Sequence, residues 1–149
     1  MTNLKISKIK NVKTPERFGK NAGIDFFIPS EDKEIIIKPQ NQVCIPSGIK
    51  VKLPKGYCMI ALNKSGIAVK HGLQVGACLV DENYTGEIHI NLFNTSNQSV
   101  LLKPDQKIIQ FIVLKPNYVL IQLEENEKDL FKESDHLERG SGGFGSTGG

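Results

Sequence analysis

The sequence predicts an all-β protein, folded as a distorted antiparallel jelly roll or barrel. Short apolar segments follow one another at even spacing, at 34–38, 43–45, 49–53 and 57–62. Proline or glycine separates successive segments, and no convincing helical pattern lies between them. Evenly spaced short strands joined by such turns are typical of sandwiches and barrels.

Further strands are expected on both sides of this group. Residues 4–9 alternate Leu, Ile and Ile with Lys and Ser, which predicts an edge strand with outward-facing lysines. Residues 100–103 are strand-like, and 118–123 are expected to form the last strand. We therefore expect one β domain over 1–138, followed by a mobile, glycine-rich C-terminal lid over 139–149.

The composition indicates a globular protein with its own core. A chain of 149 residues with 39% hydrophobic and 23% charged residues can fold without disulfides or metals. No segment approaches the ~18 apolar residues of a membrane span, and the N-terminus lacks an apolar signal region. We expect a cytoplasmic protein with no membrane partner. Cys44, Cys58 and Cys78 lie in apolar segments without metal-ligand spacing, which predicts three buried, reduced thiols.

The formal net charge of +3 hides an acidic segment near the C-terminus. Residues 124–138 carry seven acidic and two basic residues, so the rest of the chain nets about +8. This excess is spread along strands rather than clustered, and nucleic-acid binding is not expected. Residues 126–137 allow a short helix capped by Asn126, which is either a decoration of this chain or a surface for a protein partner.

The stretch 76–87 combines an apolar segment, an acidic turn and the start of a strand. Its arms, 77–80 and 87–94, predict a β-hairpin, and alternation in the second arm predicts one buried and one wet face. Asp81 stands where a buried strand meets the turn, so its carboxylate could act as a general base or simply bond its own backbone. Tyr84 could line the same site or cap an edge of the core.

Three other residues stand out because of their surroundings in the sequence. A pair of small residues precedes Asp25, which lets the backbone pass close to something bulky and leaves the carboxylate at the start of a strand. Ser65 and Gly66 offer a hydroxyl and uncrowded backbone N–H groups, which suit phosphate oxygens. Gln110 is a lone amide in an apolar segment and needs hydrogen-bond partners if it is buried.

The C-terminal segment has six glycines in its last ten residues, and one interpretation is a flexible tail. However, Arg139, one of only two arginines, opens it, and Phe144 is its one aromatic residue. Fixing such a segment costs on the order of 10 kcal/mol of backbone entropy, so ordering needs a strong ligand. Arg139 can bind a terminal phosphate, and Phe144 can stack on a base. Further phosphate contacts are expected from Gly145, Ser146 and Thr147. The tail therefore suits a nucleoside triphosphate.

Five segments in this order resemble the five motifs of the trimeric dUTPase family. They are 21–26, 63–72, 76–87, 105–111 and 139–148, so the resemblance covers nearly the whole chain. The last segment matches Arg-Gly-x-Gly-Gly-Phe-Gly-Ser-Thr-Gly at every fixed position. The second departs from the pattern, with Asn63 and Lys64 in place of Pro-Arg. The fourth departs most, with Asp105, Lys107 and Ile109 in place of Gly, Arg and Ala.

The resemblance implies hydrolysis of dUTP to dUMP and pyrophosphate by water attack at the α-phosphorus, with Mg²⁺ across the triphosphate. Asp81 would align and deprotonate the water, and Asp25 would hold the magnesium ion through water. Tyr84 would pack under the deoxyribose, and main-chain groups near Cys78 would read the uracil. Phosphate contacts would come from Lys64, Ser65, Gly66 and Gln110, together with the tail.

The resemblance also implies a homotrimer whose active sites are shared. Each site would combine the Asp25, Ser65 and Gln110 segments of one chain with the Asp81 and Tyr84 segment of a second chain and the tail of a third. Two other functions stay open at this point. A dCTP deaminase resembles dUTPases in fold and needs a glutamate near the base amine, for which Glu87 is the candidate. A non-catalytic nucleotide-sensing regulatory protein is the other.

Overall fold

The computed structural model describes residues 2–131 of the chain. By their contacts the residues fall into two units, Met1–Pro116 and Asn117–Gly149, and each unit is described by itself. No helix among the described residues is long and apolar enough to cross a membrane.

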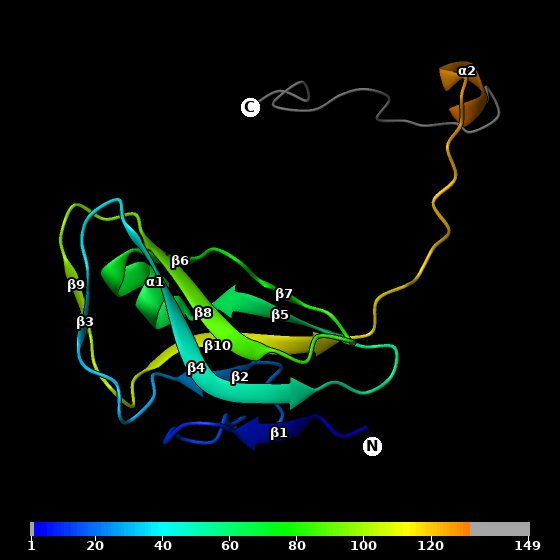
Figure 1. The fold of residues 1–149 in the computed structure, drawn as a ribbon. Coiled ribbons are helices and arrows are strands. Elements are labelled where there is room, and N and C mark those ends of the chain that lie inside the picture. The colour runs from blue at the N-terminus through cyan, green and yellow to red at the C-terminus, as the bar shows by residue number, and fades with distance from the viewer. Residues whose placement is uncertain (1, 132–149) are drawn as a thin grey trace. The chain divides into compact units, whose positions relative to one another are not determined.

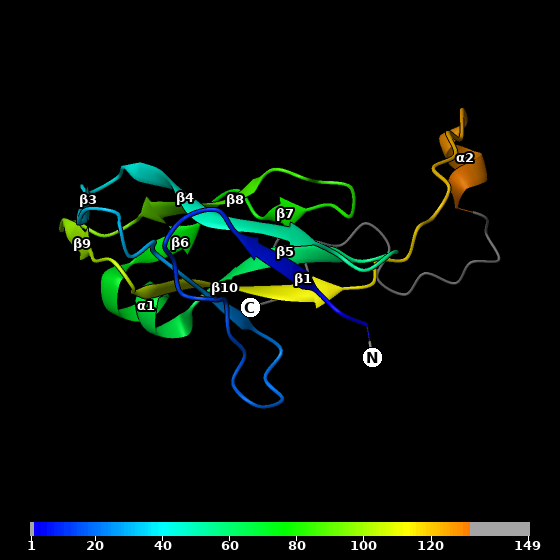
Figure 2. The same cartoon turned by 60° about the horizontal axis from the view of Figure 1, so that its bottom comes forward.

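The first unit consists of antiparallel strands and one short helix (Figure 1). The strands are β1 (Lys5–Lys8), β2 (Ile24–Phe27), β3 (Ile35–Ile37), β4 (Gln42–Lys52), β5 (Cys58–Asn63), β6 (Leu73–Val75), β7 (Leu79–Val80), β8 (Glu87–Asn94), β9 (Val100–Leu102) and β10 (Lys107–Leu114). Two four-stranded sheets have the orders β1-β4-β8-β6 and β2-β10-β5-β7. The β3–β9 pair forms a small third sheet at one end of the other two (Figures 1 and 2). The all-β prediction is confirmed.

Side chains from both larger sheets form one hydrophobic core. Phe26 of β2 and Phe111 of β10 have their ring centroids 4.6 Å apart in a tilted arrangement. In β8, Ile88, Ile90 and Leu92 are buried, as the alternating pattern predicts. Each fully buried side chain of this size contributes about 1.5–3 kcal/mol, so these contacts are the main force that holds the two sheets together.

One strand prediction is confirmed, and another needs a change. β1 is an edge strand with exposed lysines, as predicted. The segments 43–45 and 49–53, in contrast, belong to one long strand, β4. The pairing register of β4 with β8 shifts between Pro46 and Lys50, so the chain passes Pro46 through a bulge and not through a turn.

One helix is absent from the sequence prediction. Helix α1 (Ser65–His71) follows β5 and ends at Gly72, which has a φ of 65° and donates its N–H to the Ala68 carbonyl. Glycine adopts this left-handed backbone without the cost that a side chain brings. None of the seven residues is buried, so the helix has no periodic apolar face that the sequence could reveal.

The prediction of three buried thiols is correct only for Cys58. All three cysteines are free, but Cys44 and Cys78 are exposed. Cys44 lies opposite Asn91 in the β4–β8 pair, and Cys78 precedes the edge strand β7. Cys44 is an exposed residue of β4, and Cys78 lies outside the strands, and the apolar neighbours of both conceal their exposure in the sequence.

The second unit contains one short helix, α2 (Glu127–Leu130), whose residues are exposed. The Asn126 side chain accepts a hydrogen bond from the Lys128 N–H, which confirms the predicted cap, while 132–137 lie outside the described residues. The predicted strand over 118–123 is wrong. Its apolar side chains are exposed, Leu120 and Ile121 almost completely, and no described strand of this chain pairs with them. An apolar segment becomes a strand only where a neighbour satisfies its backbone groups.

Candidate active site

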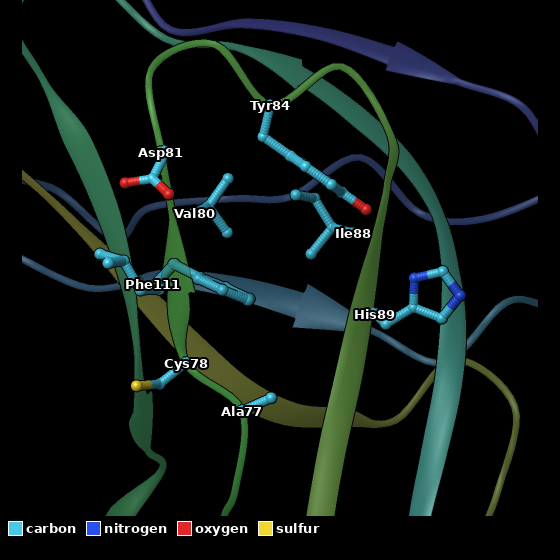
Figure 3. Close-up of a pocket in the computed structure, with 9 residues that line it drawn as sticks. Ala77, Cys78, Val80, Asp81, Tyr84, Ile88, His89 and Phe111 are labelled. Atoms are coloured by element: carbon cyan, nitrogen blue, oxygen red, sulfur yellow. The ribbon is translucent and has the colours of Figure 1, made fainter.

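A pocket of about 250 Å³ opens beside the loop between β7 and β8 (Figure 3). It is lined by Ala77, Cys78, Leu79, Val80, Asp81, Tyr84, Ile88, His89 and Phe111. Asp81 and Tyr84 lie toward the loop end of the pocket, whereas Ala77 and Cys78 lie at its other end (Figure 3). The buried side chains of Val80, Ile88 and Phe111 give the pocket an apolar floor.

The two arms of this loop are not a β-hairpin, contrary to the prediction. β7 pairs with β5, whereas β8 pairs with β4 and β6, so the arms belong to different sheets. The loop crosses from one sheet to the other, and the pocket lies where the two arms separate. Alternation alone cannot distinguish two strands that pair with each other from two that pair elsewhere.

Asp81 has an exposed side chain that is free of ion pairs among the described residues. Its carbonyl accepts the Tyr84 N–H at 3.1 Å, which closes a turn. The side-chain hydrogen bonds of the loop come from Glu82, Tyr84 and Glu87. The Asp81 carboxylate is therefore available to bind a water molecule, as a general base requires.

The backbone of β7 presents unpaired groups at the edge of its sheet. The Ala61 N–H donates to the Cys78 carbonyl at 2.8 Å, and Leu79 is the next residue opposite β5. In an antiparallel ladder, alternate residues point their backbone groups away from the partner strand. Since β7 is an edge strand, the Leu79 N–H and C=O are left facing away from β5, beside the pocket. The resemblance implies base recognition by main-chain groups near Cys78, and the outward-facing backbone groups are those of its neighbour Leu79.

A second group of predicted residues gathers around Asp25. The Lys64 Nζ is 2.8 Å from Asp25 Oδ1, and the Lys107 Nζ is 3.6 Å from Asp25 Oδ2. Lys107 also forms an ion pair with Glu16. The Glu16 carboxylate raises the pKa of Lys107 above its ordinary value, with a smaller contribution from Asp25. Lys107 was missed as a candidate, although its place in the fourth motif, where the family pattern has arginine, was a usable signal.

Gln110 joins this group through the backbone of β5 and the small residues before Asp25. Its Nε2 donates to the Asn63 carbonyl at 2.9 Å. A Cβ atom at Gly23 would lie 2.3 Å from Gln110 Oε1, closer than real atoms approach. The predicted close approach of the backbone at the small pair is confirmed, and the bulky group is the Gln110 amide. The Gln110 amide can therefore occupy its position only because residue 23 has no side chain.

Ser65 and Gly66 are the first two residues of α1, and both are exposed. They directly follow Lys64, whose ammonium group bonds Asp25, so the start of α1 lies next to the Asp25 group. Arg139, Phe144, Gly145, Ser146 and Thr147 lie outside the described residues.

The donor set around Asp25 limits how a magnesium ion could be held. Among the described residues, no group of three or more His, Cys, Asp or Glu side chains is placed to hold a metal ion. Mg²⁺ commonly keeps several waters and binds through one or two carboxylates together with substrate phosphates. A single, partly exposed Asp25 carboxylate fits a magnesium ion of that kind.

Comparison with known proteins shows the family of the chain. The dUTPase family model matches residues 10–148. A deoxyuridine 5′-triphosphate nucleotidohydrolase of Rickettsia canadensis is 36% identical, over 99% of this chain and 98% of the relative. One from Fusobacterium nucleatum is 34% identical, over 86% and 84% of the two chains. The chain belongs to the dUTPase family. A mutant dUTPase of Staphylococcus bacteriophage 80alpha with dUpNHpp is similar in fold, with a TM-score of 0.79 and 24% identity over 99% of both chains.

In this dUTPase-family chain, the predicted site residues fall into two groups on different faces of β10. Gln110 lies directly opposite Asp25, so both side chains share one face of the sheet. Phe111, the next residue, points to the other face and lines the pocket. None of Asp25, Lys64, Ser65, Gly66 and Gln110 lines the pocket that Cys78, Asp81 and Tyr84 line.

The glutamate that a deaminase would need is otherwise engaged. The Glu87 carboxylate accepts a hydrogen bond from the Gly48 N–H at 2.7 Å, and Glu87 does not line the pocket. Its position therefore gives no support to deamination.

Proposed function

We propose that this chain hydrolyses dUTP to dUMP and pyrophosphate by attack of water at the α-phosphorus, which keeps uracil out of DNA and supplies dUMP. The observation that carries the proposal is the exposed Asp81 carboxylate, which has no ion-pair partner among residues 2–131 and lines a small apolar pocket. The chain shares its family with dUTP nucleotidohydrolases over nearly its whole length.

The pocket is proposed to hold the uracil. The apolar floor suits the faces of a flat base, and the free N–H and C=O of Leu79 suit its polar edge. An N–H and a C=O can pair with a carbonyl and the ring N–H of uracil, whereas cytosine presents an amine and an unprotonated nitrogen at those positions. Close packing of the base against this floor would also exclude the extra methyl of thymine. Tyr84, at the rim, would pack under the deoxyribose where a 2′-hydroxyl could not fit.

Asp81 is proposed to orient the attacking water and accept its proton. The Asp81 side chain is exposed and forms no ion pair with another described residue, so its carboxylate is accessible to a water molecule. Proton transfer to a positioned side chain of this kind contributes roughly 10²–10⁴-fold to a rate. When bound, a magnesium ion would neutralise charge on the triphosphate, and Asp25 would hold it through water.

Phosphate binding is assigned to the second group. Lys64 would exchange its contact with Asp25 for a phosphate oxygen, and Gln110 would contribute its amide. Ser65 and Gly66 would contribute a hydroxyl and a backbone N–H at the start of α1. The C-terminal contacts are proposed for Arg139, Phe144, Gly145, Ser146 and Thr147.

The functional unit is proposed to be a homotrimer with shared sites. The two groups of residues lie on different faces of β10, so one chain offers a single substrate only part of what it needs. The exposed apolar side chains of 118–123 also support assembly, because contiguous apolar surface on a monomer commonly marks an interface.

The direct test is to incubate the full chain with dUTP, dCTP, dTTP and UTP in turn, and to measure released pyrophosphate and ammonia. We expect pyrophosphate from dUTP only. Ammonia from dCTP would indicate a deaminase, and nucleotide binding without any product would indicate a non-catalytic sensor. Either result would overturn the proposal.

A further inference from the structure

Two glutamates tie the crossing loop to the segment that contains β4 and the turn after it. The Glu82 Oε2 accepts the Gly56 N–H, and the Glu87 Oε1 accepts the Gly48 N–H, each at 2.7 Å. The two bonds join the same chemical groups at opposite ends of the loop. The two glutamates differ because the backbone carbonyl of Glu87 also accepts a hydrogen bond from Tyr84.

The Glu87 bond fills a gap in the β4–β8 pairing. Gly48 lies within the stretch where the register shifts between Pro46 and Lys50, and its φ is 73°. A bulge leaves an extra residue outside the regular ladder. The Glu87 carboxylate supplies an acceptor for the Gly48 N–H, and a bond to a charged acceptor is stronger than a neutral one. The start of β8 is thereby fixed to β4.

The Glu87 carbonyl, in turn, holds Tyr84. It accepts the Tyr84 hydroxyl at 2.9 Å and lies 3.0 Å from His89 Nδ1, which must carry the proton in such a bond. The Tyr84 ring also lies against the Gly86 backbone, since a Cβ atom there would be 2.4 Å from the Tyr84 hydroxyl oxygen. Gly86 and Glu87 together hold the Tyr84 ring in place at the edge of the pocket.

We propose that Glu87 is the positioning residue for sugar selection. Its carboxylate, anchored on the β4 bulge, keeps its carbonyl where the Tyr84 hydroxyl can bond it, and the ring then stays where it blocks a 2′-hydroxyl. The inference rests on the proposed role of Tyr84. Without the anchor, the start of β8 can shift, the ring gains freedom, and UTP can enter. The Glu82 bond does not touch Tyr84, so its loss leaves sugar selection intact.

The test compares kcat/KM for UTP with that for dUTP in the full chain and five variants. Tyr84→Ala, Tyr84→Phe and Glu87→Ala should each raise the UTP-to-dUTP ratio. For Glu87→Ala we expect about tenfold, the effect of losing one hydrogen bond to a charged group. Glu87→Gln keeps an oxygen acceptor for Gly48 and should stay within about threefold of wild type, as should the matched control Glu82→Ala. Thermal unfolding of every variant identifies any that do not fold.

Four outcomes would overturn the inference. An unchanged ratio in Glu87→Ala, while Tyr84→Ala admits UTP, would show that Glu87 does not position Tyr84. An equal rise in Glu82→Ala would show general loosening of the loop. If Glu87→Ala does not fold, Tyr84→Phe provides the test, because it removes the hydrogen bond between residue 84 and the Glu87 carbonyl and keeps the ring. An unchanged UTP-to-dUTP ratio in Tyr84→Phe would contradict the inference. Failure of Tyr84→Ala to admit UTP would remove the role of Tyr84 itself, whereas loss of dUTP turnover in the wild type would concern only the proposed function.

Discussion

Asp81 and Asp25, the two aspartates assigned to the chemistry, lie in opposite surroundings. Asp81 is exposed and has no ion-pair partner among the described residues. The Asp25 side chain is only 20% exposed and has lysine ammonium groups near both oxygens. The free carboxylate can take up a proton from water, whereas the paired one already serves as a site for positive charge. One residue type thus gains two functions from its neighbours.

The Asp25 pairs are also suited to exchange. Ion pairs between partly exposed side chains contribute about 0–1 kcal/mol, so substrate can replace them at little cost. A triphosphate would draw Lys64 away and leave Asp25 free for a cation. The contrast between the free Asp81 carboxylate and the exchangeable ion pairs of Asp25 leads to four predictions, given in order of decreasing expected effect on activity.

Asp81→Asn should give the largest effect. The change keeps the shape of the side chain and removes its basicity, so turnover of dUTP should fall by roughly 10²–10⁴-fold. Folding and nucleotide binding should be unchanged, because within the described part of the chain the carboxylate has no ion-pair or hydrogen-bond partner. Pyrophosphate release measures turnover, and calorimetry with a non-hydrolysable dUTP analogue measures nucleotide binding. Near-normal turnover would remove Asp81 from the mechanism.

Gly23→Ala should act through Gln110. The new Cβ would collide with Gln110 Oε1, and displacement of the amide should lower kcat/KM by about 10–100-fold. In a Gln110→Ala background the space is open, so adding Gly23→Ala should cost little more. Full additivity of the two changes would show that Gly23 does not act through the amide.

The Lys64 variants test the exchangeable cluster. Lys64→Met removes a cation and should lower kcat/KM by about tenfold, whereas Lys64→Arg keeps the charge and should stay within about threefold. Lys103→Met is the control, because this exposed lysine pairs with Glu34 at 3.9 Å, away from Asp25. An equal loss in Lys64→Met and Lys103→Met would mean that only the overall charge matters.

Cys78→Ser should give the smallest effect. If the backbone of Leu79 reads the base, the neighbouring thiol is dispensable, and kcat/KM should change by less than about threefold. A loss beyond tenfold would assign base recognition to the side chain.

The sequence predicted the sheets better than their pairing. Alternation identified β1 and β8, because Ile6 of β1 packs against the core and one face of β8 is buried. It carries no information about which strand pairs with which, and the crossing loop was therefore taken for a hairpin. Helix α1 was missed because none of its residues is buried. The candidate site residues were proposed from motif order. The contacts of Gly23 with Gln110 and of Glu87 with Gly48, in contrast, join residues 87 and 39 positions apart. No local pattern marks such contacts.

The division of the site residues between two faces of β10 is the central claim, and subunit complementation tests it most directly. Asp25→Asn and Asp81→Asn proteins should each be folded, trimeric and nearly inactive. Co-refolded in equal amounts, they should regain activity, because about a quarter of the shared sites would combine a sound Asp25 from one chain with a sound Asp81 from another. Mixed trimers verified by mass that remain inactive would show that each chain builds its own site, and would contradict the account.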